Sequence, residues 1–285
     1  MEATEVAALL GQPACKIECR QIEATGGFQL RVYSFYPEDG GGGCPVVFIP
    51  GWTSVMEGWA PLLSKWTEQR EIHYIETREK RSAIAPKGRL KKEHMAILRH
   101  AEDLSSVVKT LDLGDDVLWF GSSLGATAIL HGMMDGLLTG RAAFLISPNS
   151  EFRFSTWMVP ITWFPWWFYA PIIRIFMPYL KWRIKEKKQF QRYRRTLLGA
   201  HLLRLKRSLQ ANRQYDLPDG LGKIDIPVAI CVAESDTLHT GDDAHDTANA
   251  LPKGELLEVP SNQYTHEADV IEDIDAWEAA LTDPA

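Results

Sequence analysis

The segment that most constrains this chain runs from Val117 to Ala126, where a short apolar run ends in the residues Gly121-Ser122-Ser123-Leu124-Gly125. The apolar run is typical of a buried parallel strand, and the proline-free residues 126–134 that follow are typical of a helix. Glycines two positions before and after Ser123 leave room for a sharp crossing from strand to helix. Such a turn holds its serine in a strained conformation and points the hydroxyl into a cleft, so Ser123 is the candidate nucleophile.

The neighbouring Ser122 is the weaker candidate. If Ser122 stood at the apex of the turn, glycines would be needed at the positions that Phe120 and Leu124 occupy. An ordinary strand-to-helix turn is the other interpretation of the same small residues. The strand and the helix on either side favour the turn that presents a nucleophile.

Strands and helices alternate along most of the chain. Strands are expected at 17–23, 28–36, 46–49, 72–75, 117–120, 141–147, 226–233 and 255–259. Helices are expected at 59–68, 93–113, 126–134, 242–251 and 268–281. This alternation predicts an α/β fold with a mostly parallel central sheet covered by helices on both faces. Residues 149–225 fit no strand-helix unit, so we expect an inserted helical cap between core segments 1–148 and 226–285.

The order of these elements, together with the serine turn, resembles the α/β-hydrolase family across residues 17–281 apart from the insert. In that family a catalytic triad follows the chain order serine, acid, histidine. The resemblance therefore implies Ser123 as the nucleophile and Asp236, which follows the strand at 226–233, as the acid. It implies His266, which follows the last strand, as the general base.

Alternatives to two of these residues stay open. His239 is the rival base, because it lies three residues after Asp236. The rival acids are Glu234, Asp242 and Asp243. Glu234 lies too close to the end of its strand to turn toward a distant histidine. Asp242 and Asp243 resemble the start of a helix, where the helix dipole favours acidic residues.

The resemblance also implies an oxyanion hole, formed by the backbone N–H groups of Trp52 and Leu124. Pro50 departs from the histidine that usually opens the first of these loops. The residues Glu76-Thr77-Arg78-Glu79 depart from the Asp-x-Arg-Gly turn of the family, and the sequence assigns that loop no role.

The insert differs from the rest of the chain in composition. Residues 181–207 hold eleven lysines and arginines against one acid, although the whole chain has a net charge of −6. Residues 152–193 hold fourteen of the 29 aromatic residues. The tryptophans among them that we predict to bind substrate are Trp157, Trp163, Trp166 and Trp167.

Two interpretations of the insert are open. In one, the aromatic residues form the buried underside of a cap over an apolar pocket, and a basic helix at 181–207 is its solvated outer face. In the other, the cap contacts an anionic membrane surface. Prolines at 160, 165 and 171 argue against a membrane crossing. Nucleic acid is not an expected partner, since no binding motif accompanies the charge.

The N-terminal residues and the cysteines bear on cellular location and on cofactors. The N-terminus Met1 to Glu5 has acids where a signal peptide has bases, which predicts a cytoplasmic protein, peripheral at the membrane if the cap docks there. Four cysteines agree with a reducing compartment. Cys15 and Cys19 have no partners at metal-ligand spacing, so neither a metal nor a cofactor is expected.

Together these features predict a serine hydrolase that cleaves carboxylic esters with apolar groups, including lipid-like ones, through an acyl-enzyme. A thioesterase, a lysophospholipase or a cofactor-free perhydrolase would use the same triad. A noncatalytic protein that binds lipid or docks on membranes is the alternative from another class.

Overall fold

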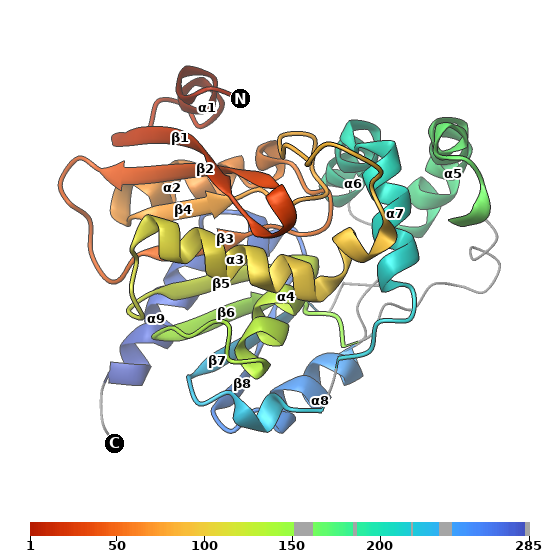
Figure 1. Cartoon of the computed structure of the whole chain (residues 1–285). Helices are drawn as coiled ribbons and strands as arrows, with labels where there is room; N and C mark the ends of the chain where they lie inside the picture. Colours follow the sequence, from red (N-terminus) through yellow and green to blue (C-terminus); the bar gives the residue numbers. More distant parts are fainter. Residues whose placement is uncertain (151–161, 185–186, 218, 234–240, 283–285) are drawn as a thin grey trace.

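The computed structural model describes residues 1–150, 162–184, 187–217, 219–233 and 241–282. Within them eight strands form one sheet in the order β1-β2-β4-β3-β5-β6-β7-β8 (Figure 1). The strands are β1 (Cys15–Glu23), β2 (Gln29–Pro37), β3 (Val46–Ile49), β4 (Ile72–Ile75), β5 (Leu118–Ser122), β6 (Ala142–Ile146), β7 (Val228–Ala233) and β8 (Gly254–Val259). Strand β2 is antiparallel to both of its neighbours, and the other pairs are parallel. The predicted α/β fold is confirmed.

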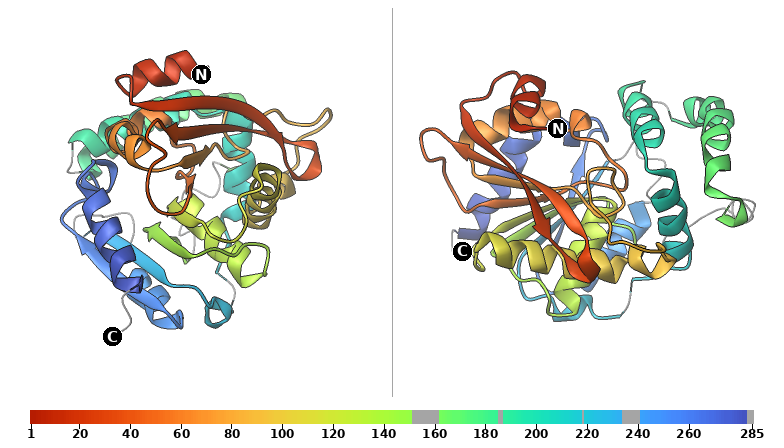
Figure 2. Two further views of the ribbon diagram at one scale, coloured as in Figure 1. Left: turned by 90° about the vertical axis from the view of Figure 1, so that its left-hand side faces the viewer. Right: turned by 45° about the horizontal axis from the view of Figure 1, so that its top comes forward.

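Helices cover both faces of the sheet (Figures 1 and 2). One face packs against α3 (Ile97–Leu111), α4 (Leu124–Met134) and α8 (Gly241–Ala250). The other packs against α1 (Ala3–Leu9), α2 (Ala60–Gln69) and α9 (Val270–Thr282). Neighbouring strand residues point to opposite faces. Accordingly Trp119 belongs to the first core and Phe120 to the second.

Between β6 and β7, in the range 149–225 where the sequence predicts an insert, the structure has helices that lie beyond the carboxyl ends of the parallel strands, to the right in Figure 1. We call these helices the insert. They are η5 (Trp166–Phe168), α5 (Tyr169–Arg183), α6 (Lys187–Gly199) and α7 (Leu202–Asn212), with η6 (Leu221–Lys223) leading back to the sheet. The prediction of a single basic helix at 181–207 is wrong. Ile184 is extended and ends α5, and Gly199 ends α6 before α7 begins.

The region before α3 also differs from its prediction. The helix expected at 93–113 is a short 3₁₀ turn, η3 (Lys92–Met95), followed by α3. Ala96 between them has an extended backbone, with φ −70° and ψ 150°. The Asn212 amide of α7 donates a hydrogen bond of 3.0 Å to the Met95 carbonyl, so the insert contacts the chain at this break. The shorter turns elsewhere are η1 (Thr25–Gly27), η2 (Met56–Gly58) and η7 (Tyr264–His266).

The insert is joined to the sheet domain by buried polar contacts. Arg204 of α7 is buried and donates to the carbonyl oxygens of Arg78 and Lys80. Arg81 donates in the opposite direction, to the Ala200 carbonyl at 3.0 Å. Among the residues that the structure describes, no helix is both long enough and apolar enough to cross a bilayer.

Candidate active site

The predicted sharp turn lies between β5 and α4, with Ser123 at its apex. Ser123 has φ 49° and ψ −115°, a conformation that non-glycine residues rarely adopt. A Cβ on Gly125 would lie 2.2 Å from the Ile49 carbonyl oxygen, and one on Gly121 would lie 2.8 Å from Ala126 Cα. Both glycines are therefore required by close backbone approach, as the sequence predicted.

The Ser123 side chain is half-buried, and its neighbour is a residue that the sequence analysis did not single out. The Asn149 side-chain amide donates a hydrogen bond of 3.1 Å to Ser123 Oγ. The Asn149 backbone N–H in turn donates to Thr127 Oγ1 at 2.9 Å. Asn149 follows β6, which lies beside β5, and the carboxyl ends of parallel strands meet at one edge. The position of Asn149 directly after the strand beside β5 is the sequence signal that could have identified it.

The loop after β3 passes beside the serine. A Cβ on Gly51 would lie 3.5 Å from Ser123 Cβ, and Trp52 is the next residue. Leu124 is the first residue of α4, where backbone N–H groups have no partner inside the helix. In the described part of the chain, neither the Trp52 nor the Leu124 N–H donates a hydrogen bond. Both remain the predicted oxyanion donors.

The Trp52 side chain also joins the loop to the insert. It packs against a small apolar cluster that includes Tyr169, Ile173 and Leu205, from α5 and α7. The insert therefore contacts the residue whose backbone N–H is a predicted oxyanion donor.

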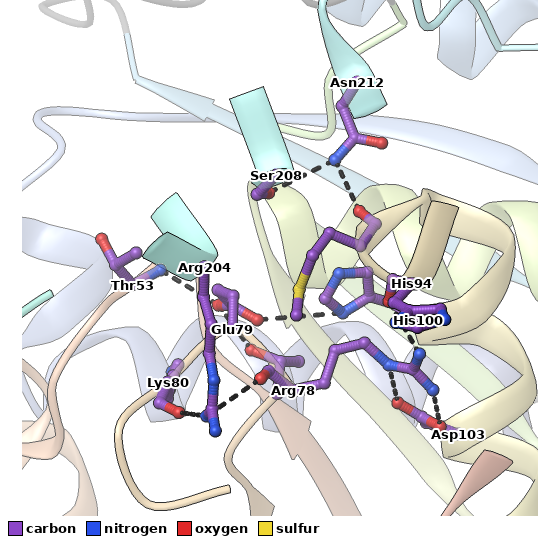
Figure 3. Close-up of polar contacts among 12 residues, drawn as sticks. Thr53, Arg78, Glu79, Lys80, His94, His100, Asp103, Arg204, Ser208 and Asn212 are labelled. Carbon is purple, nitrogen blue, oxygen red and sulfur yellow. Dashed lines mark hydrogen bonds and ion pairs between the residues drawn. The ribbon is translucent and has the colours of Figure 1, made fainter. Parts of the chain in front are cut away.

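The loop after β4, to which the sequence assigned no role, supports this arrangement (Figure 3). Buried Glu79 accepts hydrogen bonds from the Thr53 N–H at 3.1 Å and from Thr77 Oγ1 at 2.8 Å. Thr53 follows Trp52 and has a φ of 50°. A carboxylate that holds the Thr53 N–H therefore fixes the loop that contains the predicted oxyanion donor.

Next to Glu79, a buried ion pair fixes the loop itself (Figure 3). Arg78 Nε donates to Asp103 Oδ2 at 2.6 Å, and Arg78 Nη2 donates to Asp103 Oδ1. Arg78 Nη1 donates to the His94 carbonyl at 2.7 Å. Both charged side chains are 1% exposed, so the pair is almost completely removed from water.

Two further titratable groups lie in the same buried region. Burial lowers the pKa of Lys80 and the pKa of His100 below their ordinary values. His100 Nδ1 lies 3.9 Å from Glu79 Oε2. In the ranges that the structure describes, no group of three or more histidine, cysteine or acidic side chains is arranged to hold a metal ion.

His266 lies in η7 and is buried against Trp59, with ring centroids 3.7 Å apart. Its Nδ1 lies 3.0 Å from the Gly58 carbonyl oxygen. A carbonyl can only accept, so Nδ1 carries a proton and, in the neutral ring, Nε2 keeps its lone pair. Burial and, secondly, the charge of Arg192 lower the pKa of His266 well below its ordinary value of 6.5.

Ser123 and His266 are not joined by a hydrogen bond. Catalytic hydrogen bonds are often long before substrate binds, so this separation is compatible with a later approach. Arg192 of α6 lies near Gly58 and His266, since a Cβ on Gly58 would lie 3.3 Å from Arg192 Cδ. It donates to Asn262 Oδ1 at 2.6 Å and to Gln263 Oε1, so it faces the histidine loop and not the solvated surface that was expected.

Several predicted residues lie outside the described part of the chain: Asp236, its rivals Glu234 and His239, and Trp157. The other predicted substrate-binding tryptophans are exposed, Trp163 by 78%, Trp166 by 47% and Trp167 by 57%. Their exposure does not fit the buried underside of a cap.

Comparison with solved structures identifies the fold. The chain is similar to a thermophilic esterase from Thermogutta terrifontis, with a TM-score of 0.71, 15% identity, and coverage of 94% of this chain and 100% of that one. It is also similar to an esterase from Exiguobacterium antarcticum, with a TM-score of 0.69, 18% identity, and coverage of 93% and 99%. An enol-lactonase from Burkholderia xenovorans LB400 has a TM-score of 0.65, 16% identity, and coverage of 93% and 98%. Neither protein-family models nor curated proteins match the sequence. The chain has the α/β-hydrolase fold.

Proposed function

We propose that this protein is a serine hydrolase of carboxylic esters that works through an acyl-enzyme. The observation that carries the proposal is the strained conformation of Ser123 at the strand-to-helix turn, beside two backbone N–H groups without partners in the described chain. The similar structures named above include two esterases and an enol-lactonase, and a lactone is a cyclic ester. These neighbours support ester chemistry at the general level.

In the first half of the proposed reaction, Ser123 Oγ attacks the ester carbonyl carbon while His266 Nε2 takes the hydroxyl proton. The carbonyl π electrons move onto oxygen, where the Trp52 and Leu124 N–H groups stabilise the negative charge. When the oxyanion collapses, the bond to the alcohol breaks and His266 returns the proton to the leaving oxygen. Water then attacks the acyl-enzyme by the same route and regenerates the serine.

The environment of His266 suits the role of base. The hydrogen bond to the Gly58 carbonyl favours the tautomer that has its lone pair at Nε2. The lowered pKa keeps the ring neutral at neutral pH, so the base is available without a proton being removed first. To reach Ser123 the ring must move toward the serine when substrate binds.

We assign the acid to Asp236, and the substrate to carboxylic esters with apolar groups, including lipid-like ones. The contact between Trp52 and the insert supports a cap that shields the ester from one side. Thioesters, lysophospholipids and peracid formation would use the same groups, and a series of esters and thioesters of increasing acyl length would rank them.

Replacement of Ser123 by alanine tests the nucleophile. We expect Ser123→Ala to remove covalent labelling by a fluorophosphonate and to lower ester hydrolysis by about 10⁴-fold or more, since no other group can form the acyl-enzyme. Ser122→Ala is the matched control and should keep most of both. Labelling that persists in Ser123→Ala would refute the assignment. A wild-type protein that neither labels nor hydrolyses any ester would be the noncatalytic alternative.

Replacement of Asp236 tests the acid. Asp236→Asn should lower kcat by about 10³- to 10⁴-fold with little change in thermal unfolding, because the carboxylate that stabilises the imidazolium is lost while the shape remains. A loss smaller than about tenfold would assign orientation of the ring to the Gly58 carbonyl instead. Asp243→Asn is the control that separates Asp236 from the neighbouring acids.

A further inference from the structure

A cavity of about 470 Å³ lies between the insert and residues 89–93, which lead into and begin η3. Its lining includes five cationic side chains and one carboxylate, namely Arg89, Lys91, Lys92, Arg207, Arg213 and Glu93. In the described chain none of the five cations forms an ion pair. The residues that line this cavity include neither Ser123 nor the Arg78–Asp103 pair.

The guanidinium of Arg207, in α7, is only partly satisfied by hydrogen bonds. Its Nη1 donates to Gln210 Oε1 at 2.8 Å, but its Nε is shielded from solvent and has no acceptor among the residues described. Shielded donors without acceptors are unfavourable, and like charges that share a cavity repel. A ligand with several anionic oxygens would offset the repulsion between the cations.

An exposed aromatic surface borders the cavity at Trp163. We call it the aromatic edge, and it consists of Trp163, Phe164, Trp166, Trp167 and Phe168. Residues 162–183 contain no aspartate or glutamate. The chain here is tied to α7, because Gln210 donates to the Thr162 carbonyl at 2.8 Å and Lys206 donates to the Phe164 carbonyl. The aromatic edge and the cavity are therefore parts of one surface.

We propose that this surface docks on an anionic phospholipid membrane, with a lipid phosphate headgroup in the cavity and the aromatic edge in the bilayer interface. Tryptophan and phenylalanine rings beside lysines and arginines are the composition that partitions into that interface. The absence of acids from the aromatic edge avoids repulsion by anionic lipid. The cavity volume suits a headgroup but not a whole lipid, whose chains stay in the membrane. The docking is independent of the proposed hydrolysis.

Cosedimentation of the full chain with vesicles tests the proposal. We compare vesicles of phosphatidylcholine alone with vesicles that also contain phosphatidylglycerol. Binding to the anionic vesicles should be stronger by about tenfold or more and should weaken as salt is raised. Arg207→Gln/Arg213→Gln should lose most of this preference and still hydrolyse a soluble short-chain ester. Trp163→Ser/Trp167→Ser should weaken binding to vesicles, with folding verified by circular dichroism.

The matched control for the arginines is Lys65→Gln/Lys109→Gln, which removes the same charge elsewhere. Lys109 lies near the far end of α3, about 18 Å along the helix from its first residue. The control should bind anionic vesicles like the wild type. If it loses binding equally, the attraction is unspecific and the proposal is overturned.

Two further outcomes would also overturn the proposal. Saturable binding of glycerol phosphate, without binding to vesicles, would assign the cavity to a free phosphate compound. Binding of a single-stranded oligonucleotide that depends on Arg207 and Arg213, again without vesicle binding, would assign the surface to nucleic acid. Each outcome leaves the labelling of Ser123 unaffected, so failure here is distinguishable from failure of the proposed hydrolysis.

Discussion

The loop after β4 and the insert both hold arginines, but these arginines differ in whether they form an ion pair. In the loop after β4, Arg78 is 1% exposed and paired with Asp103 through two hydrogen bonds. In the insert, Arg207 and Arg213 line a cavity without an ion pair in the described residues. The Arg78–Asp103 pair is removed from water, so each of its charges depends on the other for compensation. Cations that line a surface cavity can be neutralised by a ligand from solution. The Arg78–Asp103 pair is therefore structural, whereas the cavity with Arg207 and Arg213 is suited to binding.

The largest expected effect concerns the buried pair. Arg78→Met leaves the Asp103 carboxylate buried and unpaired, so the free energy of unfolding should fall by about 3–5 kcal/mol. Arg213→Met, which removes an unpaired cation, should change it by no more than about 0.5 kcal/mol. Urea denaturation measures both.

The double variant Arg78→Met/Asp103→Leu sharpens this comparison. It removes both charges and should recover a large part of the lost stability, because no unpaired ion remains. Equal destabilisation by Arg78→Met and Arg213→Met would show that the two regions do not differ as the structure indicates.

The next effect tests whether the loop after β4 positions the proposed oxyanion donor. Glu79→Ala leaves the Thr53 N–H without its acceptor, and kcat for ester hydrolysis should fall by about 10- to 100-fold. KM should change less, because the oxyanion forms only as the reaction proceeds. Glu79→Gln keeps an acceptor oxygen and should retain most of the activity. A rise in KM with unchanged kcat would give Glu79 a role in substrate binding instead.

The smallest expected effect concerns Arg192, the cation of the insert that faces the loop of His266. The positive charge of Arg192 lowers the pKa of His266, because it disfavours the imidazolium. Arg192→Gln should therefore raise that pKa and move the acid limb of the kcat/KM profile to higher pH. In the wild type, this limb should lie below pH 6.5. Arg194→Gln, at an exposed position of α6, is the control that should leave the limb in place.

Local patterns were enough to predict most of the elements. The strands expected at 46–49 and 72–75 are β3 and β4. The sharp turn at Ser123 was also predictable, because its two glycines are needed by contacts within one strand-turn-helix unit and its neighbouring strand. Helix α1 and the break at Ala96 were missed. The helical periodicity of residues 93–113 does not show that α7 contacts the chain at Met95.

The sequence by itself determined the fold class, the turn at Ser123 and the unusual composition of the insert, because these depend on the spacing of glycines, the alternation of apolar runs and charge. Only the tertiary structure decided that Asn149 contacts Ser123 Oγ, that Glu79 holds the Thr53 N–H and that Arg192 faces the His266 loop. It also decided which cations are paired and which line a cavity. Charge and aromatic content are properties of residues, whereas burial and pairing depend on which distant segments pack together.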